Sequence, residues 1–408
     1  MSVVAVGQKR VESPDRTHQR RVNGEEQELP IIIVLTGVTG TLGVHILDKL
    51  RTSDQVAEVH CLVRGADQHA ARERVRKALQ QKQLPPPEQS KPEIHIHTCK
   101  LTDEQTLGLR PEVYEHLQQK AALIIHAAWQ VNFNLPLKGF EDQLISLKNL
   151  LSLPLRSYRP ATPSFLFCSS TASVLSHQSP RIIAEQVYSS PKVASNVGYA
   201  QSKWVAESVC RKFADSHKIP IAIARIGQLC GDEATGTWNV TEAWPLMLSS
   251  VRVTGALPDL KETLNWLKVD VAASAVLQIS FDLLEESSSN RPSTDSLAVY
   301  HVINDNSAPK WTDMLTWIKR FKQDLLVLPP AEWVDRVENL AGPDRDHPAR
   351  KLLGLWKTAY CGDESKEKAR DVTFEMEKTL AVAPILKDVR PIDEAYFARV
   401  WEWIQREM

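Results

Sequence analysis

Tyr199 and Lys203 stand four residues apart in the segment GYAQSKWVAE. On a helix this spacing puts both side chains on one face, where an ammonium group can lower the pKa of a phenol. Thr171 precedes them in CSSTASV, at the end of an apolar run, and its hydroxyl can orient a substrate oxygen. Tyr199 is then the proton donor of a catalytic triad. Ser170 and Ser173 compete with Thr171 for the hydroxyl role.

A glycine-rich loop lies upstream of these residues. TGVTGTLG spaces Gly37, Gly40 and Gly43 as G-x-x-G-x-x-G, between the apolar run IIIVL and the helical pattern VHILDKLRT. Such glycines let the backbone turn sharply and approach a pyrophosphate, whose charge lies at the positive end of the helix. The loop therefore predicts a dinucleotide site, and it gives weight to a Tyr-Lys pair that alone can arise by chance. The other loop residues expected at this site are Thr39, Thr41 and Leu42.

Arg64 ends the second apolar run, where NAD-specific enzymes place an acidic residue on the ribose 2′-hydroxyl. A guanidinium suits a 2′-phosphate instead, and Arg74 on the following helix can add a second charge. The sequence therefore predicts NADPH as the cofactor, with Lys203 holding its nicotinamide ribose. The alternative for either arginine is an ordinary solvated side chain.

Short apolar runs alternate with helical patterns through the first half of the chain. The runs are IIIVL (31–35), EVHCLVR (58–64), EIHIHTCKL (93–101), ALIIHAA (122–128), SFLFCSS (164–170) and IPIAIARIG (219–227). Strands separated by helices form a parallel, doubly wound sheet, so we expect an α/β fold of the Rossmann-like type.

The alternation of strand-like and helical segments along the sequence also predicts the domain boundaries. Residues 1–29 are polar and mixed in charge, which is typical of a flexible leader. Residues 30–231 are expected to form the NADP-binding domain, and the more mixed residues 232–408 a smaller substrate-binding region. Within that region, segments 264–280 and 296–304 are expected to return to the first domain.

The composition excludes several classes of partner. The 408 residues are 43% hydrophobic, which allows a substantial core, and the net charge of −1 argues against nucleic acid or an anionic membrane. The six cysteines stand far apart without a zinc-type spacing, so we expect buried thiols in a reducing compartment and no metal site.

With no run of 18 apolar residues, the chain is expected to be a soluble, cytoplasmic protein without a membrane partner. Its oligomeric state is left open.

The chain resembles the terminal thioester reductase domain of fungal adenylate-forming reductases and of peptide and polyketide synthetases. That family belongs to the extended short-chain dehydrogenases/reductases with a male-sterility-type NAD-binding domain. The resemblance runs from about residue 31 through TGVTGTLG, CLVRG, IIHAAWQVNFNLPLKGFE, GYAQSKWVAE, ARIGQLCGD, TGTWNVTEAWPLML, NWLKVD and APIL. The VNFNLP and WNVTEAWPLM segments are not general features of short-chain dehydrogenases.

The resemblance implies an enzyme of specialised metabolism that uses NADPH to reduce an acyl thioester to an aldehyde or an alcohol. The thioester would be carried by coenzyme A or by the phosphopantetheine arm of a separate carrier protein. The resemblance gives the catalytic roles to Thr171, Tyr199 and Lys203, and places Leu101 and Ala127 beside the cofactor. Hydroxyls of this kind can stabilise the oxyanion that forms when hydride reaches the carbonyl.

Two positions depart from the family pattern. Lys100 precedes Leu101 where the family has an acidic residue, and Lys268 stands in the place of a proline. The sequence lacks the adenylation and carrier domains that precede such reductases, which is typical of a free-standing reductase or of an excised domain. Two other functions stay open: an extended short-chain dehydrogenase acting on a free aldehyde, ketone or sugar nucleotide, and a non-catalytic NADPH-binding protein.

Overall fold

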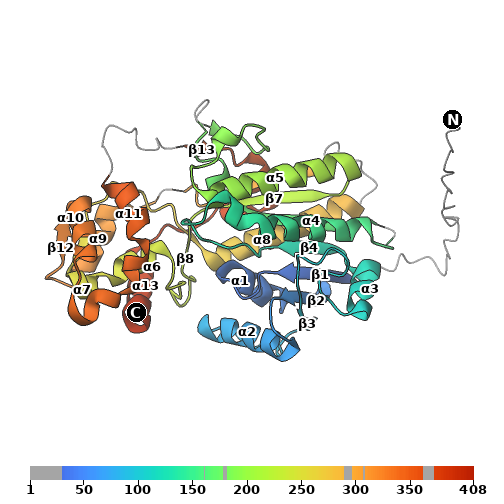
Figure 1. Cartoon of the computed structure of the whole chain (residues 1–408), viewed down its shortest axis with the longest axis horizontal. Coiled ribbons are helices and arrows are strands. Elements are labelled where there is room, and N and C mark those ends of the chain that lie inside the picture. Colours follow the sequence, from blue (N-terminus) through green and yellow to red (C-terminus); the bar gives the residue numbers. More distant parts are fainter. Residues whose placement is uncertain (1–29, 160, 178–181, 289–295, 307, 362–371) are drawn as a thin grey trace, which may run out of the picture. The chain divides into compact units, whose positions relative to one another are not determined.

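A parallel sheet of seven strands, in the order β11-β7-β5-β4-β1-β2-β3, forms the centre of the computed structural model (Figure 1). The strands are β1 (Ile31–Thr36), β2 (Val56–Val63), β3 (Glu93–Thr98), β4 (Leu123–His126), β5 (Ser164–Ser170), β7 (Ile221–Ile226) and β11 (Leu297–Val302). Every run expected as a strand is present, and β11, from segment 296–304, pairs with β7. The α/β fold class is therefore confirmed.

The structure describes residues 30–159, 161–177, 182–288, 296–306, 308–361 and 372–408. The leader expected over residues 1–29 lies outside them. Residues 31–408 form one compact unit.

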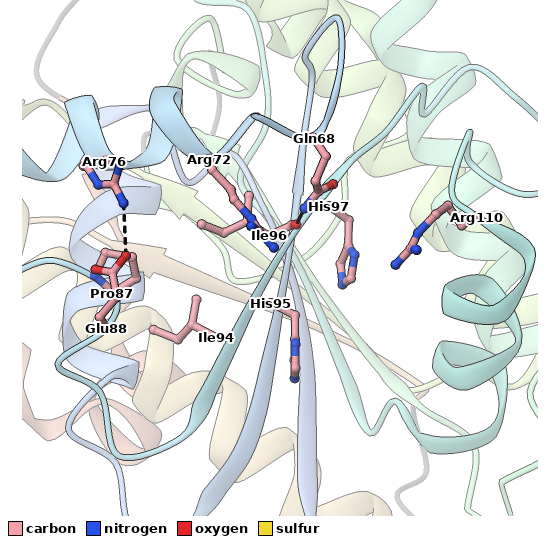
Figure 2. A pocket seen from close by; sticks show the side chains of 10 residues that line it. All are labelled: Gln68, Arg72, Arg76, Pro87, Glu88, Ile94, His95, Ile96, His97 and Arg110. Atoms are coloured by element: carbon pink, nitrogen blue, oxygen red, sulfur yellow. Dashed lines mark hydrogen bonds and ion pairs between the residues drawn. The ribbon is translucent and has the colours of Figure 1, made fainter. Parts of the chain in front are cut away.

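Burial along the strands follows their position in the sheet. The inner strands β5 and β7 are almost entirely buried, because helices cover both faces and both rows of side chains must be apolar. The edge strand β3 is only partly buried, and its residue types alternate, with Ile94 and Ile96 on one face and His95 and His97 on the other (Figure 2). Polar side chains on an edge strand disfavour pairing with another chain.

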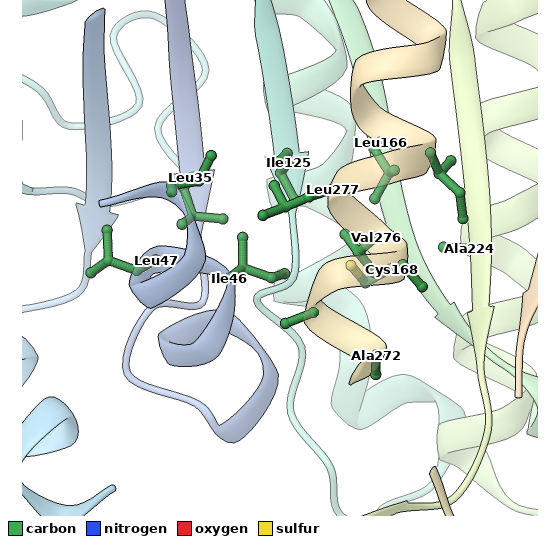
Figure 3. Close-up of a cluster of buried hydrophobic side chains, with 14 of the residues drawn as sticks. Leu35, Ile46, Leu47, Ile125, Leu166, Cys168, Ala224, Ala272, Val276 and Leu277 are labelled. Atoms are coloured by element: carbon green, nitrogen blue, oxygen red, sulfur yellow. The ribbon is translucent and has the colours of Figure 1, made fainter. Parts of the chain in front are cut away.

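Two helical layers cover the sheet. One apolar core lies between the strands and α1 (Thr41–Leu50), α2 (Gln68–Gln81) and α8 (Val269–Ser288). Figure 3 shows Ile46 and Leu47 of α1, and Val276 and Leu277 of α8, directed toward this core. The other face packs against α3 (Pro111–Lys120), α4 (Glu141–Leu155) and α5 (Gly198–His217).

The C-terminal region has a separate, tryptophan-rich core. Its helices are α6 (Ala243–Ser249), α7 (Val251–Thr254), α9 (Trp311–Phe321), α10 (Pro330–Glu338), α11 (Leu353–Tyr360) and α13 (Glu394–Glu407). α12 (Glu377–Val382) packs with the first core instead. The small parallel pairs are β6 (Ile182–Ile183) with β13 (Thr373–Phe374), β8 (Leu229–Cys230) with β10 (Leu267–Lys268), and β9 (Ala256–Pro258) with β12 (Leu326–Leu328). The tryptophans buried in this core are Trp238, Trp266, Trp311, Trp333, Trp356, Trp401 and Trp403.

Two expectations from composition can be compared with the structure. Five cysteines are buried free thiols, as expected, but Cys361 is exposed because it follows the last turn of the surface helix α11. Within the described ranges, no helix combines the length and the apolar character that crossing a membrane requires.

A buried ion pair fixes α5 to the sheet. Glu207 of α5 and Arg225 of β7 have fully buried side chains, with 2.8 Å between Oε2 and Nη2. Ser169 and Ser173 donate to Oε1 of the same carboxylate at 2.6 and 2.7 Å. Arg225 also donates to the carbonyl oxygen of Gln186 at 2.7 Å. These hydrogen bonds offset the free-energy cost of removing both charges from water. Loss of either side chain would leave the other charge buried without its counter-ion.

We expect Arg225→Met to lower the free energy of unfolding by about 3–5 kcal/mol, because Glu207 would stay buried without its counter-ion. Urea unfolding followed by circular dichroism measures the loss. Lys148→Met is the matched control: it breaks the exposed Lys148–Glu104 pair, which solvent screens, and should change stability little. Equal effects of the two substitutions would contradict the structural role of the buried pair.

Candidate active site

The glycine-rich loop between β1 and α1 is packed too closely to admit side chains. Gly37 has φ of +83°, a left-handed conformation that glycine adopts without strain. A Cβ there would lie 2.6 Å from the carbonyl carbon of Ala127, at the end of β4. On Gly43, in α1, a Cβ would lie 2.1 Å from the carbonyl oxygen of Gly37. The loop therefore presents bare backbone at the carboxyl edge of the sheet, as a phosphate site needs.

A cavity of about 560 Å³ opens beside this loop. Of the residues predicted to bind the cofactor, those that line it are Gly37, Thr39, Gly40, Arg64, Arg74, Leu101 and Ala127. Thr41, Leu42 and Gly43, at the start of α1, are not among its lining residues, and Leu42 packs against the core. Tyr199 and Lys203 of α5, also predicted to bind the cofactor, do not line the cavity either. The structure thus gathers strand ends and loop around one cavity, as the sequence predicts for a dinucleotide site.

Positive charge dominates one part of the cavity wall. Its lining includes Arg64, Arg74 and Lys100, against a single carboxylate, Asp142. The Arg74 guanidinium donates to the carbonyl oxygen of Arg64 and lies 3.4 Å from the Thr39 hydroxyl, so it bridges the end of β2 and the glycine-rich loop. Lys100, one of the departures from the family pattern, adds a third cation here. This part of the cavity suits a phosphate group.

His126, a cavity-lining residue, has one ring nitrogen without a partner among the described residues. Its Nδ1 lies 2.8 Å from the Thr36 hydroxyl, which also accepts the backbone N–H of Ala128. Burial, with a smaller effect of Lys203, lowers the pKa of His126 to about 3, so the ring is neutral. Nε2 has no hydrogen-bond partner among the described residues, although His126 lines the cavity. The described residues therefore satisfy one ring nitrogen of His126 and leave the other unsatisfied.

Lys203 lies in the second turn of α5, buried against aromatic rings. Its Nζ donates to the carbonyl oxygen of Cys168 at 2.7 Å and lies 4.5 Å from the ring centre of Trp129 and 4.7 Å from that of Phe167. Burial lowers the pKa of Lys203 to about 7. Trp129 also lines the cavity, so the predicted catalytic lysine adjoins the predicted cofactor site through one indole ring.

Tyr199 lies one turn before Lys203 and keeps its proton. Burial raises the pKa of its phenol to about 12, and a hydrogen bond with the Ser170 side chain opposes this increase. The sequence predicted that Lys203 lowers the pKa of the Tyr199 phenol, and this prediction is wrong for the present arrangement. Lys203 Nζ is directed to the Cys168 carbonyl oxygen and lies 5.9 Å from the centre of the phenol ring. A protonated phenol is the form that a proton donor requires.

The structure separates the three candidate hydroxyls. Ser173 is buried, and its hydroxyl oxygen lies 2.7 Å from both the Ser170 carbonyl oxygen and Glu207 Oε1, so its single proton is committed to the structure. Ser170 accepts the Ala172 backbone N–H and bonds to Tyr199, while Thr171 follows at the partly exposed end of β5. Ser170 and Thr171 therefore remain as candidates.

Sequence reasoning named the VNFNLP segment but gave it no role. Phe133 of this segment packs edge-on against the Tyr199 ring, with 5.3 Å between ring centres, and Phe140 lies 6.3 Å from the same ring. Both rings therefore pack against the Tyr199 side chain. The resemblance to the reductase family was the one sequence feature that drew attention to this segment. An apolar side chain in a loop does not by itself indicate a functional site.

Residues 35–276 match the male sterility protein family of NAD-binding domains, which is more than half of the chain. The chain belongs to this family. The matched region holds the glycine-rich loop, Arg64, Thr171, Tyr199 and Lys203, and the resemblance noted in the sequence is confirmed.

Relatives of the chain include a peptide synthetase and an adenylate-forming reductase. The non-canonical non-ribosomal peptide synthetase ascB of Acremonium egyptiacum is 31% identical over 80% of this chain and 30% of its own length. An adenylate-forming reductase of Aspergillus terreus (strain NIH 2624 / FGSC A1156) is 29% identical over 91% of this chain and 35% of its own length. The chain thus spans about a third of the length of these relatives.

Solved reductase domains share the fold. The terminal R domain from the myxalamid PKS-NRPS pathway aligns with a TM-score of 0.74 at 24% identity, over 92% of this chain and 90% of that domain. For a bound dinucleotide, the bare loop and the cationic wall provide a fitting site in this member of the male sterility protein family.

Gly43→Ala tests the close packing of the loop. We expect it to weaken NADPH and NADH binding by at least about tenfold, because its Cβ must displace the Gly37 carbonyl. Titration by protein fluorescence measures both affinities. Gly354→Ala, in a helix with open space around the added Cβ, is the control and should leave them unchanged. Native affinity in Gly43→Ala would show that the loop does not hold the dinucleotide.

Proposed function

We propose that this chain is an NADPH-dependent reductase of acyl thioesters. The observation that carries the proposal is the protonated Tyr199 phenol, one turn before Lys203 on α5, with Trp129 linking Lys203 to a cationic dinucleotide cavity. Membership of the male sterility protein family supports an oxidoreductase. The thioester as electrophile is supported by relatives named as adenylate-forming reductases and peptide synthetases.

The cationic wall supports NADPH over NADH. Arg64 and Arg74 would bind the 2′-phosphate, and Lys100 would add a third charge at the same end of the cavity. The backbone around Gly37 would receive the pyrophosphate. When bound, the cofactor supplies the hydride.

The residues around Tyr199 can carry the polar part of the reaction. The phenol donates a hydrogen bond to the thioester carbonyl oxygen, and Thr171 or Ser170 supplies a second donor. As the carbonyl carbon gains hydride, negative charge on that oxygen is stabilised and then neutralised by the Tyr199 proton. The resulting hemithioacetal breaks its C–S bond, the thiolate leaves with a proton, and an aldehyde is released. A second hydride would give the alcohol.

The thioester form of the substrate implies a carrier. We propose that the acyl group arrives on a phosphopantetheine thiol, either of a carrier protein or of coenzyme A. Relatives that are parts of peptide and polyketide synthetases support the carrier-bound form. Lys203 would hold the nicotinamide ribose. Its pKa of about 7 leaves the side chain partly protonated at neutral pH.

Arg64→Ala tests the cofactor preference. We expect the dissociation constant of NADPH to rise by about 10- to 100-fold, since a charged hydrogen bond contributes about 1.5–3 kcal/mol, while that of NADH changes little. Fluorescence titration with both cofactors measures this. Arg76→Ala removes an arginine of α2 that pairs with Glu73 and Glu88 instead, and should preserve the preference. Equal weakening of NADPH and NADH would contradict a 2′-phosphate role for Arg64.

The reaction is tested with acyl-pantetheine thioesters, the matching aldehydes and NADPH, with loss of cofactor absorbance and product identification as readouts. Turnover of a thioester to an aldehyde or alcohol is expected, whereas turnover of aldehydes alone would exclude the thioester. Tyr199→Phe should lower kcat by at least about 100-fold with cofactor affinity kept, because the proton donor is lost. Tyr158→Phe, at an exposed tyrosine, is the control. Full activity in Tyr199→Phe would contradict its assigned role.

A further inference from the structure

A cluster of imidazoles and one carboxylate lies at the edge of the sheet, apart from the cavity described above. Glu58 Oε2 lies 2.8 Å from His60 Nε2 and 2.9 Å from His116 Nε2. One ligand atom from each of these three residues lies within 4.8 Å of the other two. His95 Nε2 is 3.9 Å from the same carboxylate oxygen and 3.3 Å from Glu93.

Three elements bring these side chains together. Glu58 and His60 stand two residues apart on β2, and therefore on one face of the sheet. The parallel register places His60 beside His95 of β3, and His97 follows two residues later on the same face. α3 packs on this face and contributes His116. No linear motif connects these residues, which is why their spacing in the sequence indicated no metal site.

The distances are compatible with a tetrahedral zinc ion. Zinc–nitrogen and zinc–oxygen bonds of about 2.0–2.2 Å place neighbouring ligand atoms about 3.3–3.5 Å apart. The distances from Glu58 Oε2 to His60 Nε2 and to His116 Nε2 are within about half an ångström of that spacing, and one ligand atom from each of the three residues lies within 4.8 Å of the others. Imidazole nitrogens with a carboxylate oxygen are a ligand set that zinc accepts, and His95 is near enough to complete it by a side-chain rotation.

The surroundings orient the central ligand. His60 Nδ1 lies 3.0 Å from His97 Nε2, so its other ring nitrogen, Nε2, is fixed toward Glu58. A partner on the second nitrogen is the usual support of a metal-bound histidine. The rings of His95 and His116 lie 4.7 and 5.2 Å from that of His60. The side chains of His95 and His116 are 37% and 39% exposed, which leaves solvent access for an ion.

We propose that Glu58, His60 and His116 bind one Zn²⁺ ion, with His95 as the fourth ligand. The ion would join α3 to the edge strands β2 and β3. The same strands lead directly to Arg64 and Leu101 in the cofactor cavity, so the site would stabilise that end of the cavity. The inference does not depend on the proposed reaction.

Calorimetric titration of Zn²⁺ into tag-free, chelator-treated full-length protein tests the site. We expect one ion per chain with a dissociation constant on the order of micromolar or tighter, and a higher melting temperature in its presence. His116→Ala and Glu58→Gln should each weaken binding by at least about tenfold. His217→Ala, at an exposed histidine in the last turn of α5, should leave it unchanged. Cobalt substitution should give the absorption bands of a tetrahedral site.

The inference is overturned if the native chain takes up no Zn²⁺, or if both ligand variants bind it as the native chain does. The cluster would then be a hydrogen-bond network that attaches α3 to the sheet. Circular dichroism of the ion-free variants shows whether they fold. If His116→Ala fails to fold, Glu58→Gln, which preserves side-chain volume, and His95→Ala still decide between the two outcomes.

Discussion

The buried charge of Glu207 determines where the predicted catalytic residues can lie. Tyr199, Lys203 and Glu207 are spaced four residues apart on α5, so they share one face of the helix. Glu207 is held by Arg225 of β7 and by Ser169 of β5, which fixes that face against the ends of both strands. A rotation of α5 that moved Tyr199 or Lys203 away from β5 would leave a fully buried carboxylate without its partners, a change that costs several kcal/mol.

The cofactor half of the site depends on close backbone packing rather than on charge. The glycine-rich loop touches the backbone of Ala127, one residue beyond β4, and His126 of the same strand is held by Thr36 of β1. Trp129, further along that connection, lies between the cavity and Lys203, and its indole N–H donates to Ser202 of α5 at 3.1 Å. The segment after β4 therefore sets the distance between the dinucleotide cavity and the catalytic helix.

The sequence predicted the central sheet well because its signals are local. Each inner strand is a continuous apolar run, and the loop after β1 is fixed by glycines that tolerate no side chain. The pairs β8–β10 and β9–β12 have only two or three residues per strand, too few for a periodic pattern. Lys268 shows why other features could not be predicted. It is buried beside the ring of Tyr396 and forms a 2.9 Å ion pair with Glu233, and these partners are too distant in the sequence for any local pattern to indicate them.

The same limit explains why the Tyr-Lys pair could be located but its electrostatics could not. Spacing places Lys203 beside Tyr199, yet the ammonium is held by the Cys168 carbonyl and by the faces of Trp129 and Phe167. These interactions are weaker than a carboxylate contact, and burial therefore brings the pKa of Lys203 down to about 7. Glu207, one turn away, is committed to Arg225 and two serines. A lysine without a dedicated carboxylate can exchange its carbonyl partner for the hydroxyls of a bound sugar, which is what the proposed function requires of it.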